Sequence, residues 1–244
     1  MFRKNLGNFL SMFETEKSLA SSWFKSLRDE IVSAFKQIEI DHLSGPFSDE
    51  APGTFEVKET ERTADDGSDA GGGIMSVMRN GRVFEKVGVN VSTVYGNLGP
   101  EAQRAMVARK DIPGIKEDPR FWASGISLVA HMQNPQCPAV HMNTRMFWTP
   151  YAWWFGGGSD LNPCIEFEED TVHFHSVLRS YLDQHNPKLY PELKKWADEY
   201  FFIPHRKRAR GVGGIFMDDR NCLLYTSDAA DEGLGVDLGG RRII

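Results

Sequence analysis

The sequence contains few cysteines and no long apolar run. Its three cysteines, Cys137, Cys164 and Cys222, are odd in number and show no Cys-x-x-Cys spacing. This argues against a disulfide framework and against a thiolate zinc site, and it fits a reducing compartment. No segment has the roughly 20 consecutive apolar residues that a transmembrane helix needs, and polar residues interrupt the apolar N-terminal stretch. We therefore expect a cytoplasmic protein without a membrane span.

An excess of positive charge is also absent. The 244 residues include 28 Lys plus Arg against 34 Asp plus Glu, which gives a net charge of −6. A surface that neutralises a phosphate backbone needs the opposite balance, so nucleic acid is not expected as a partner. Neither a phosphate-binding loop motif nor the zinc motif HExxH occurs. What is present is enough apolar sequence, 41% of residues, for a single domain with a substantial core.

Apolar residues near the N-terminus follow the period of a helix. Six of them, spaced by four or three residues, form one face: Leu19, Trp23, Leu27, Ile31, Phe35 and Ile38. This spacing predicts an amphipathic helix. Residues 41–73 are rich in Gly, Pro, Asp and Ser, and they predict a crossing loop with a short strand at 54–58.

From residue 74 the apolar pattern changes to the period of two that is typical of strands. Strands are expected at 74–79 and 82–93, joined at Asn80-Gly81 by a type I′ turn. The same reasoning predicts a helix at 101–109, strands at 122–132 and 139–148, helices at 168–185 and 191–203, and a strand at 215–217. The result is an α+β fold, an antiparallel sheet with flanking helices.

Two of these strands, joined by a Pro-containing turn, carry a group of polar side chains. Because side chains alternate across a strand, Ser127 and His131 share one face of the first strand, and His141, Asn143 and Arg145 share one face of the second. A turn centred between the strands predicts that His131 lies opposite His141 and Ser127 opposite Arg145. A solvated sheet face is the plainer alternative, and a slip of one residue would remove the convergence.

The chemistry of this face favours an anionic ligand. A guanidinium and an amide suit a carboxylate, and an imidazole beside them exchanges protons near neutral pH. Asp160 follows three glycines at 156–158, which fits either the close approach of a planar ligand or a glycine-rich turn capped by Asp160. An apolar setting would raise the pKa of Asp160, whereas N–H donors would keep it ionised. The basic run 205–211 is either a solvated turn or an attractor of a polycarboxylate.

Histidines raise a second possibility, because neutral imidazoles ligate divalent metals. Four are candidates for a shared site: His131, His141, His175 and His205. Their spacing matches no metal motif. The remaining three, His42, His173 and His185, are interpreted as surface or packing residues.

Six collinear blocks carry a more specific pattern. They are GGGIMSVMRNGRVFEKVGVNVSTVYG (71–96), GISLVAHMQNPQCPAVHMNTRMF (125–147), WWFGGGSDLNP (153–163), EEDTVHFH (168–175), LYPELKKWADEYFFIPHR (189–206) and RGVGGIFMDD (210–219). Together they resemble oxygen-dependent coproporphyrinogen III oxidase, and the N-terminal helix is compatible with that family.

The resemblance implies an activity and an architecture. The activity is the oxidative decarboxylation of coproporphyrinogen III to protoporphyrinogen IX in haem biosynthesis, in which two propionates become vinyl groups. Dioxygen is the co-substrate and carbon dioxide is released. The implied architecture is a single domain with a large antiparallel sheet flanked by helices on both faces, and a homodimer. Flavin, nicotinamide and haem motifs are absent, so no organic cofactor is expected.

The resemblance also implies roles for individual residues. His141 is the proton donor, and Asp160 lies under the pyrrole N–H groups as a base. Contacts with the substrate are implied for Ser127, Asn143, Thr144 and Arg145. The positions treated as divalent metal ligands in bacterial relatives are His131, His141, His175 and His205.

The resemblance ends after Asp219. Relatives continue with a helical dimerisation region and a GGR-containing segment, and the surroundings of Gly239-Gly240-Arg241 do not match that segment. We therefore expect a family domain at residues 1–221, incomplete at its C-terminus, and a non-family tail at 222–244. Two alternatives to the enzyme remain: a porphyrin-binding remnant without catalysis, and a His-metal hydrolase, which no motif supports.

Overall fold

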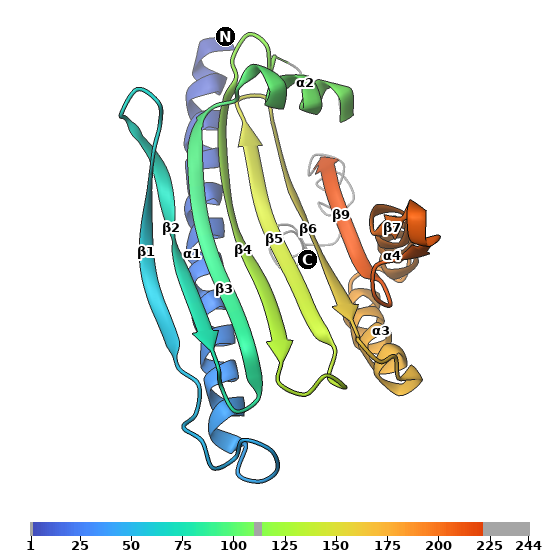
Figure 1. Ribbon diagram of the computed structural model, residues 1–244. Coiled ribbons are helices and arrows are strands. Elements are labelled where there is room, and N and C mark those ends of the chain that lie inside the picture. Colours follow the sequence, from blue (N-terminus) through green and yellow to red (C-terminus); the bar gives the residue numbers. More distant parts are fainter. Residues whose placement is uncertain (1, 110–113, 222–244) are drawn as a thin grey trace.

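Residues 2–109 and 114–221 are described by a computed structural model of the chain (Figure 1). Seven strands form one antiparallel sheet in the order β1-β2-β3-β4-β5-β6-β9. They are β1 (Phe55–Thr63), β2 (Asp69–Arg79), β3 (Phe84–Asn97), β4 (Arg120–Met132), β5 (Ala139–Thr149), β6 (Ala152–Asn162) and β9 (Gly214–Asn221). The other elements are α1 (Phe2–Asp41), α2 (Pro100–Arg109), α3 (Glu168–Asp183), α4 (Leu189–Tyr200), the strand pair β7 (Phe202–Ile203) and β8 (Arg208–Ala209), and the short 3-10 helix η1 (Pro204–Arg206).

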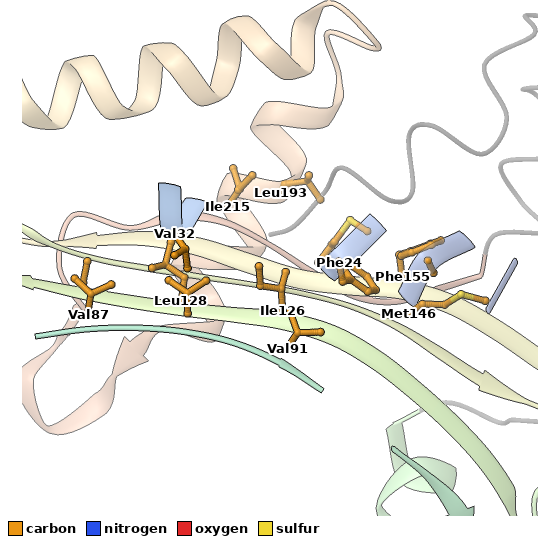
Figure 2. Close-up of a cluster of buried hydrophobic side chains, with 14 of the residues drawn as sticks. Phe24, Val32, Val87, Val91, Ile126, Leu128, Met146, Phe155, Leu193 and Ile215 are labelled. Atoms are coloured by element: carbon orange, nitrogen blue, oxygen red, sulfur yellow. The ribbon is translucent and has the colours of Figure 1, made fainter. Parts of the chain in front are cut away.

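The two faces of the sheet are covered differently. Figure 1 shows α1 running behind the sheet and α2 in front of one end of it. The main core lies between the sheet and α1, α3 and α4 (Figure 2), and includes Phe24, Val32, Val87, Val91, Ile126, Leu128, Met146, Phe155, Leu193 and Ile215. A smaller cluster on the opposite face joins Leu98, Ile115 and Trp154 to Met106 of α2 and Phe147. The predicted α+β fold with helices on both faces is confirmed.

The buried face of α1 is rotated from the predicted one. Phe24 is fully buried against the sheet, whereas Leu19 and Ile38 are 56% and 43% exposed. Trp23, Leu27, Ile31 and Phe35 of the predicted stripe pack at the edge of the core. The apolar stripe on α1 is wider than the surface that contacts the sheet. Which part of the stripe is buried depends on the position of the sheet, and the periodicity of the helix does not encode that position.

The predicted crossing loop at 41–73 is wrong in its second half. It contains β1 and the beginning of β2, which pair over most of their length. Strand β1 is at the edge of the sheet, and most of its side chains are exposed on both faces. Such a strand shows no alternation of apolar and polar residues, which is why the pattern indicated only a short strand there.

Glu39 holds the β2–β3 connection against α1. Its side chain is fully buried, and its two oxygens accept hydrogen bonds from the backbone N–H groups of Gly53 (2.8 Å), Arg82 (2.6 Å), Val83 (2.9 Å) and Phe84 (2.9 Å). The predicted two-residue turn at Asn80-Gly81 is therefore wrong: Arg79 pairs with Lys86, and the residues between them turn toward the carboxylate. Burial acts to raise the pKa of Glu39, but the four N–H donors bring it below its usual value.

Glu39→Gln is expected to lower the free energy of unfolding by about 3 kcal/mol at neutral pH, because the new amide group leaves two of the four backbone N–H groups without an acceptor. Urea unfolding followed by circular dichroism measures the change. The control is Glu30→Gln on the exposed side of the same helix, which should stay within about 0.5 kcal/mol of the wild type.

The effect of Glu39 on stability should depend on pH. Because its pKa is lower in the folded than in the unfolded chain, the ionised carboxylate stabilises the fold above the unfolded pKa. This stabilisation is lost as the pH falls through the folded pKa. The difference between wild type and Glu39→Gln should thus be complete near neutrality and shrink below about pH 4. A difference that persisted undiminished in stronger acid would contradict this account.

Strands β4 and β5 pair two positions away from the predicted register. His141 lies opposite Val129 rather than His131, and Asn143 lies opposite Ser127. The turn between β4 and β5 is tied to the β2–β3 connection, since the backbone N–H of Gln133 donates to the carbonyl of Val83 at 2.8 Å. A shift of two residues leaves every side chain on its original face, so the predicted polar face is retained.

The other elements differ from expectation mainly at their ends. Helix α3 ends at Asp183 instead of residue 185, and α4 lies two to three residues earlier than predicted. The strand expected at 215–217 lies in the first half of β9. Gly156, Gly157 and Gly158 lie inside β6, so the interpretation of this segment as a turn is wrong. None of the helices in the described ranges combines the length and apolar composition that crossing a bilayer requires.

Candidate active site

The predicted polar side chains lie on the sheet face opposite α1. On β4, Ser127 is exposed there, and on β5 His141, Asn143 and Arg145 are half-buried. On the other side of β5, His141 lies opposite Asp160 of β6 in the strand register. The period of two along three neighbouring strands therefore assembles hydroxyl, amide, imidazole, guanidinium and carboxylate groups on one surface.

His141 and Asp160 form a hydrogen-bonded pair. Nδ1 of His141 lies 2.7 Å from Oδ1 of Asp160. Because an ionised carboxylate only accepts hydrogen bonds, Nδ1 carries the proton and Nε2 is the basic nitrogen of the neutral ring. Nε2 lies 3.5 Å from the amide nitrogen of Asn143, and a quarter of the His141 side chain is exposed. The nitrogen that can exchange a proton with a ligand is thus the one directed away from Asp160.

Asp160 is fully buried, and every oxygen has a donor. Besides His141, it accepts hydrogen bonds from Nδ2 of Asn162 (2.7 Å) and from Nε (3.0 Å) and Nη2 (2.9 Å) of Arg210. Burial acts to raise the pKa of Asp160, but the hydrogen bonds from His141 and Asn162 and the charge of Arg210 bring it below its usual value. The N–H donors that keep Asp160 ionised are therefore supplied by the protein, and its carboxyl group is ionised at neutral pH.

Arg145 is the cationic end of the same surface. Its Nη2 donates to Oδ2 of Asp218 on β9 at 2.6 Å, and its Nη1 donates to Oδ1 of Asn143 at 3.2 Å. Asp218 has room because the facing residue is Gly156, where a Cβ atom would collide with the Asp218 carboxylate. About two fifths of the Arg145 side chain is exposed, so the guanidinium can also meet a carboxylate that approaches from solvent.

These contacts join into one continuous row: Asp218, Arg145, Asn143, His141, Asp160 and Arg210. The bond from Arg145 orients the Asn143 amide so that its NH2 group faces His141. The row places a proton-exchanging imidazole next to a carboxylate-binding guanidinium, with a buried anion behind the imidazole. It is suited to acid–base chemistry on a ligand that bears carboxylate groups.

Gly125, opposite Arg145 on β4, should not tolerate a larger residue. A Cβ atom there would overlap the carbonyl oxygen of Thr144 and lie 2.9 Å from Cβ of Arg145. Gly125→Ala is expected to lower the free energy of unfolding by about 2 kcal/mol, because backbone atoms of β5 must move. Thermal unfolding tests this against Gly88→Ala, whose added Cβ would meet its nearest neighbour at 3.6 Å. Equal destabilisation by both variants would contradict the prediction.

Some predicted residues lie away from this row. Thr144 is buried on the opposite, core-facing side of β5. His131 is exposed near the end of β4, next to Lys86 of β3, and His205 is exposed in η1. His175 of α3 contacts the carbonyl of Val212 and the hydroxyl of Tyr190.

The four histidines therefore do not fit a shared metal site. Among the residues that the structure describes, no three His, Cys, Asp or Glu side chains are grouped so that they could hold a metal ion. Nδ1 of His141 is directed at Asp160, and both ring nitrogens of His175 are already hydrogen-bonded.

Asn162, Arg210 and Asp218 belong to the site but are not among the site residues predicted from the sequence. Asn162 lies two positions after Asp160 on the same strand, so the period of two already placed both on one face. Arg210 belongs to the basic run, but nothing in the local pattern distinguished it from its neighbours. The glycines that follow it, which permit a tight approach to β6, are the signal that was available.

Comparisons with known proteins agree on one family. The family model described as coproporphyrinogen III oxidase matches residues 20–233. The oxygen-dependent coproporphyrinogen-III oxidase of Rickettsia peacockii (strain Rustic) is 44% identical over 214 residues, which cover 88% of this chain and 71% of the relative. That of Rickettsia bellii (strain RML369-C) is 45% identical over 217 residues, with 89% and 72% covered. The family match thus reaches into the predicted tail at 222–244, which lies outside the described residues.

Proposed function

Because the chain belongs to the coproporphyrinogen III oxidase family, we propose that it catalyses the oxygen-dependent conversion of coproporphyrinogen III to protoporphyrinogen IX in porphyrin biosynthesis. Each of two propionate side chains loses carbon dioxide, a proton and two electrons and becomes a vinyl group, and dioxygen accepts the electrons. The observation that carries this proposal is the row from Asp218 to Arg210, which combines a guanidinium for a propionate with an imidazole for a proton.

The residues of the row have complementary roles in this proposal. Arg145, assisted by Asn143 and Ser127, binds a propionate at the rim of the macrocycle. Nε2 of His141 exchanges the proton that leaves or joins the substrate. Asp160 acts through His141: it fixes the tautomer and balances the charge of the protonated ring. Its occupied oxygens and lowered pKa favour this role over direct removal of a pyrrole proton.

The function is tested with the purified chain and reduced coproporphyrinogen III in air. We expect formation of the divinyl product, detected by fluorescence after oxidation to the porphyrin, together with release of carbon dioxide. The same mixture without dioxygen should give no product. Tight binding of coproporphyrinogen without carbon dioxide release would instead identify a binding protein and overturn the proposed activity.

Four further expectations from the sequence and the family resemblance stay predictions. They are the homodimer, the cytoplasmic location, the absence of an organic cofactor and the division of the chain at residue 221. Sedimentation of the purified chain measures the oligomeric state directly.

A further inference from the structure

The loop that carries Arg210 is fastened to the end of β6. The backbone N–H of Val212 donates to the carbonyl of Leu161 at 3.0 Å, and the N–H of Leu161 donates to Gly213 at 3.2 Å. Gly211 has a positive φ of 57°, and a Cβ there would overlap the carbonyl of Leu161. The loop therefore passes close beside Leu161, the residue that follows Asp160, and its position decides where the Arg210 guanidinium lies.

Arg210 is held by Phe201 through both its backbone and its side chain. Its backbone N–H donates to the carbonyl of Phe201 at 2.9 Å, and its guanidinium carbon lies 4.3 Å from the centre of the Phe201 ring. From there the guanidinium makes its two hydrogen bonds to Asp160. Displacement of the loop would move a charge that lies directly behind the His141–Asp160 pair.

His175 fixes this loop from the outside. Nε2 of its ring lies 3.0 Å from the carbonyl oxygen of Val212, and Nδ1 lies 3.0 Å from the hydroxyl of Tyr190. A carbonyl can only accept, so Nε2 carries a proton, and in the neutral ring Nδ1 accepts from Tyr190. A divalent metal needs an unprotonated ring nitrogen with a free lone pair, and neither nitrogen meets that condition.

We propose that His175 is a positioning residue: by holding the carbonyl of Val212 it keeps the 210–213 loop in place, so that Arg210 stays paired with Asp160. This role replaces the metal-ligand role that the family resemblance implied for His175. Its catalytic consequence rests on the proposed oxidase function, whereas its structural consequence does not.

The catalytic part is tested with a double-mutant cycle. His175→Ala is expected to lower kcat/KM by about tenfold to a hundredfold, the range that small misplacements in an active site produce. If His175 acts through Arg210, adding His175→Ala to the Arg210→Ala variant should lower kcat/KM by less than about twofold further. A double variant whose loss of kcat/KM equals the product of the two single losses would overturn the proposal.

A conservative variant separates hydrogen bonding from metal binding. The amide N–H of His175→Gln can donate to Val212, but an amide nitrogen is a poor metal ligand. We expect His175→Gln to recover most of the activity that His175→Ala loses. The control is His173→Ala, an exposed histidine on the same helix, which should match the wild type. Loss of a stoichiometric metal in both His175 variants would overturn the proposal.

A readout independent of activity covers the case in which the proposed function fails. Under native conditions, trypsin should cut after Arg210 several-fold faster in His175→Ala than in wild type, because the loop is released from α3. His175→Gln should be cut at the wild-type rate. The cleaved bond is identified by mass spectrometry. Equal rates in all three proteins would refute the positioning role, whatever the enzyme assay shows.

Discussion

Replacement of His141 by glutamine is expected to lower kcat about a thousandfold, within the range typical for loss of a general acid–base group. Glutamine fills a similar space and can still bond to Asp160, but it cannot exchange a proton at the position of Nε2. KM should change by less than about threefold, because Arg145 and its neighbours still bind the carboxylates. Steady-state turnover of coproporphyrinogen in air measures both constants.

The interpretation of this result depends on matched variants. His173→Gln, at an exposed position of α3, should keep the wild-type kcat. Circular dichroism and thermal unfolding of His141→Gln should match the wild type, since the side chain is partly exposed and lies outside the core. A correctly folded His141→Gln that retained full kcat would rule out His141 as the proton-exchanging group.

Asp160→Asn should also lower kcat by about a thousandfold, although the side chain keeps its shape. Each carboxylate oxygen accepts two hydrogen bonds, so replacing one oxygen by an NH2 group leaves two of the four donors without an acceptor and removes the negative charge beside the imidazole and the Arg210 guanidinium. The imidazole then loses its fixed tautomer and the anion that balances its protonated form. The same assay as for His141 tests this, and Asp66→Asn, in the exposed connection between β1 and β2, is the control.

Asp160 should also contribute to stability, in a way that depends on pH. Asp160→Asn is expected to lower the free energy of unfolding by about 2 kcal/mol at neutral pH. The loss is no larger because the Arg210 side chain is nearly half exposed, so water still solvates its charge. Because the folded pKa of Asp160 is lowered, this contribution is present above the unfolded pKa and is lost as the pH falls through the folded value. Urea unfolding near neutrality and in acid checks both points. Identical stabilities at neutral pH would contradict the network.

The residues that the sequence placed correctly are those governed by strand periodicity. Ser127, Asn143 and His141 share a face because alternate residues of a strand do so, and this survived an error of two positions in register. The register itself depends on the turn, which Gln133 ties to Val83 in the β2–β3 connection. A contact of that kind, between residues 50 positions apart in the chain, leaves no local pattern.

The partners of the predicted site residues were harder to foresee for the same reason. Arg210 meets Asp160, and Asp218 meets Arg145, only because β9 pairs with β6. Glu39 is a further example: nothing about a glutamate near the end of an amphipathic helix indicates that it accepts four N–H groups from loops far along the chain. Charged residues are rarely buried, so a charged residue in the sequence does not by itself indicate a buried partner.

The pairing of β9 with β6 determines when this surface can form while the protein is being synthesised. Ribosomes release the N-terminal part of a chain first, so β4, β5 and β6 emerge before Arg210 and Asp218. In such a nascent chain, Asp160 has no guanidinium to neutralise it and Arg145 has no carboxylate beside it. Translation must therefore proceed past residue 218 and β9 must dock before the charges of this surface are balanced.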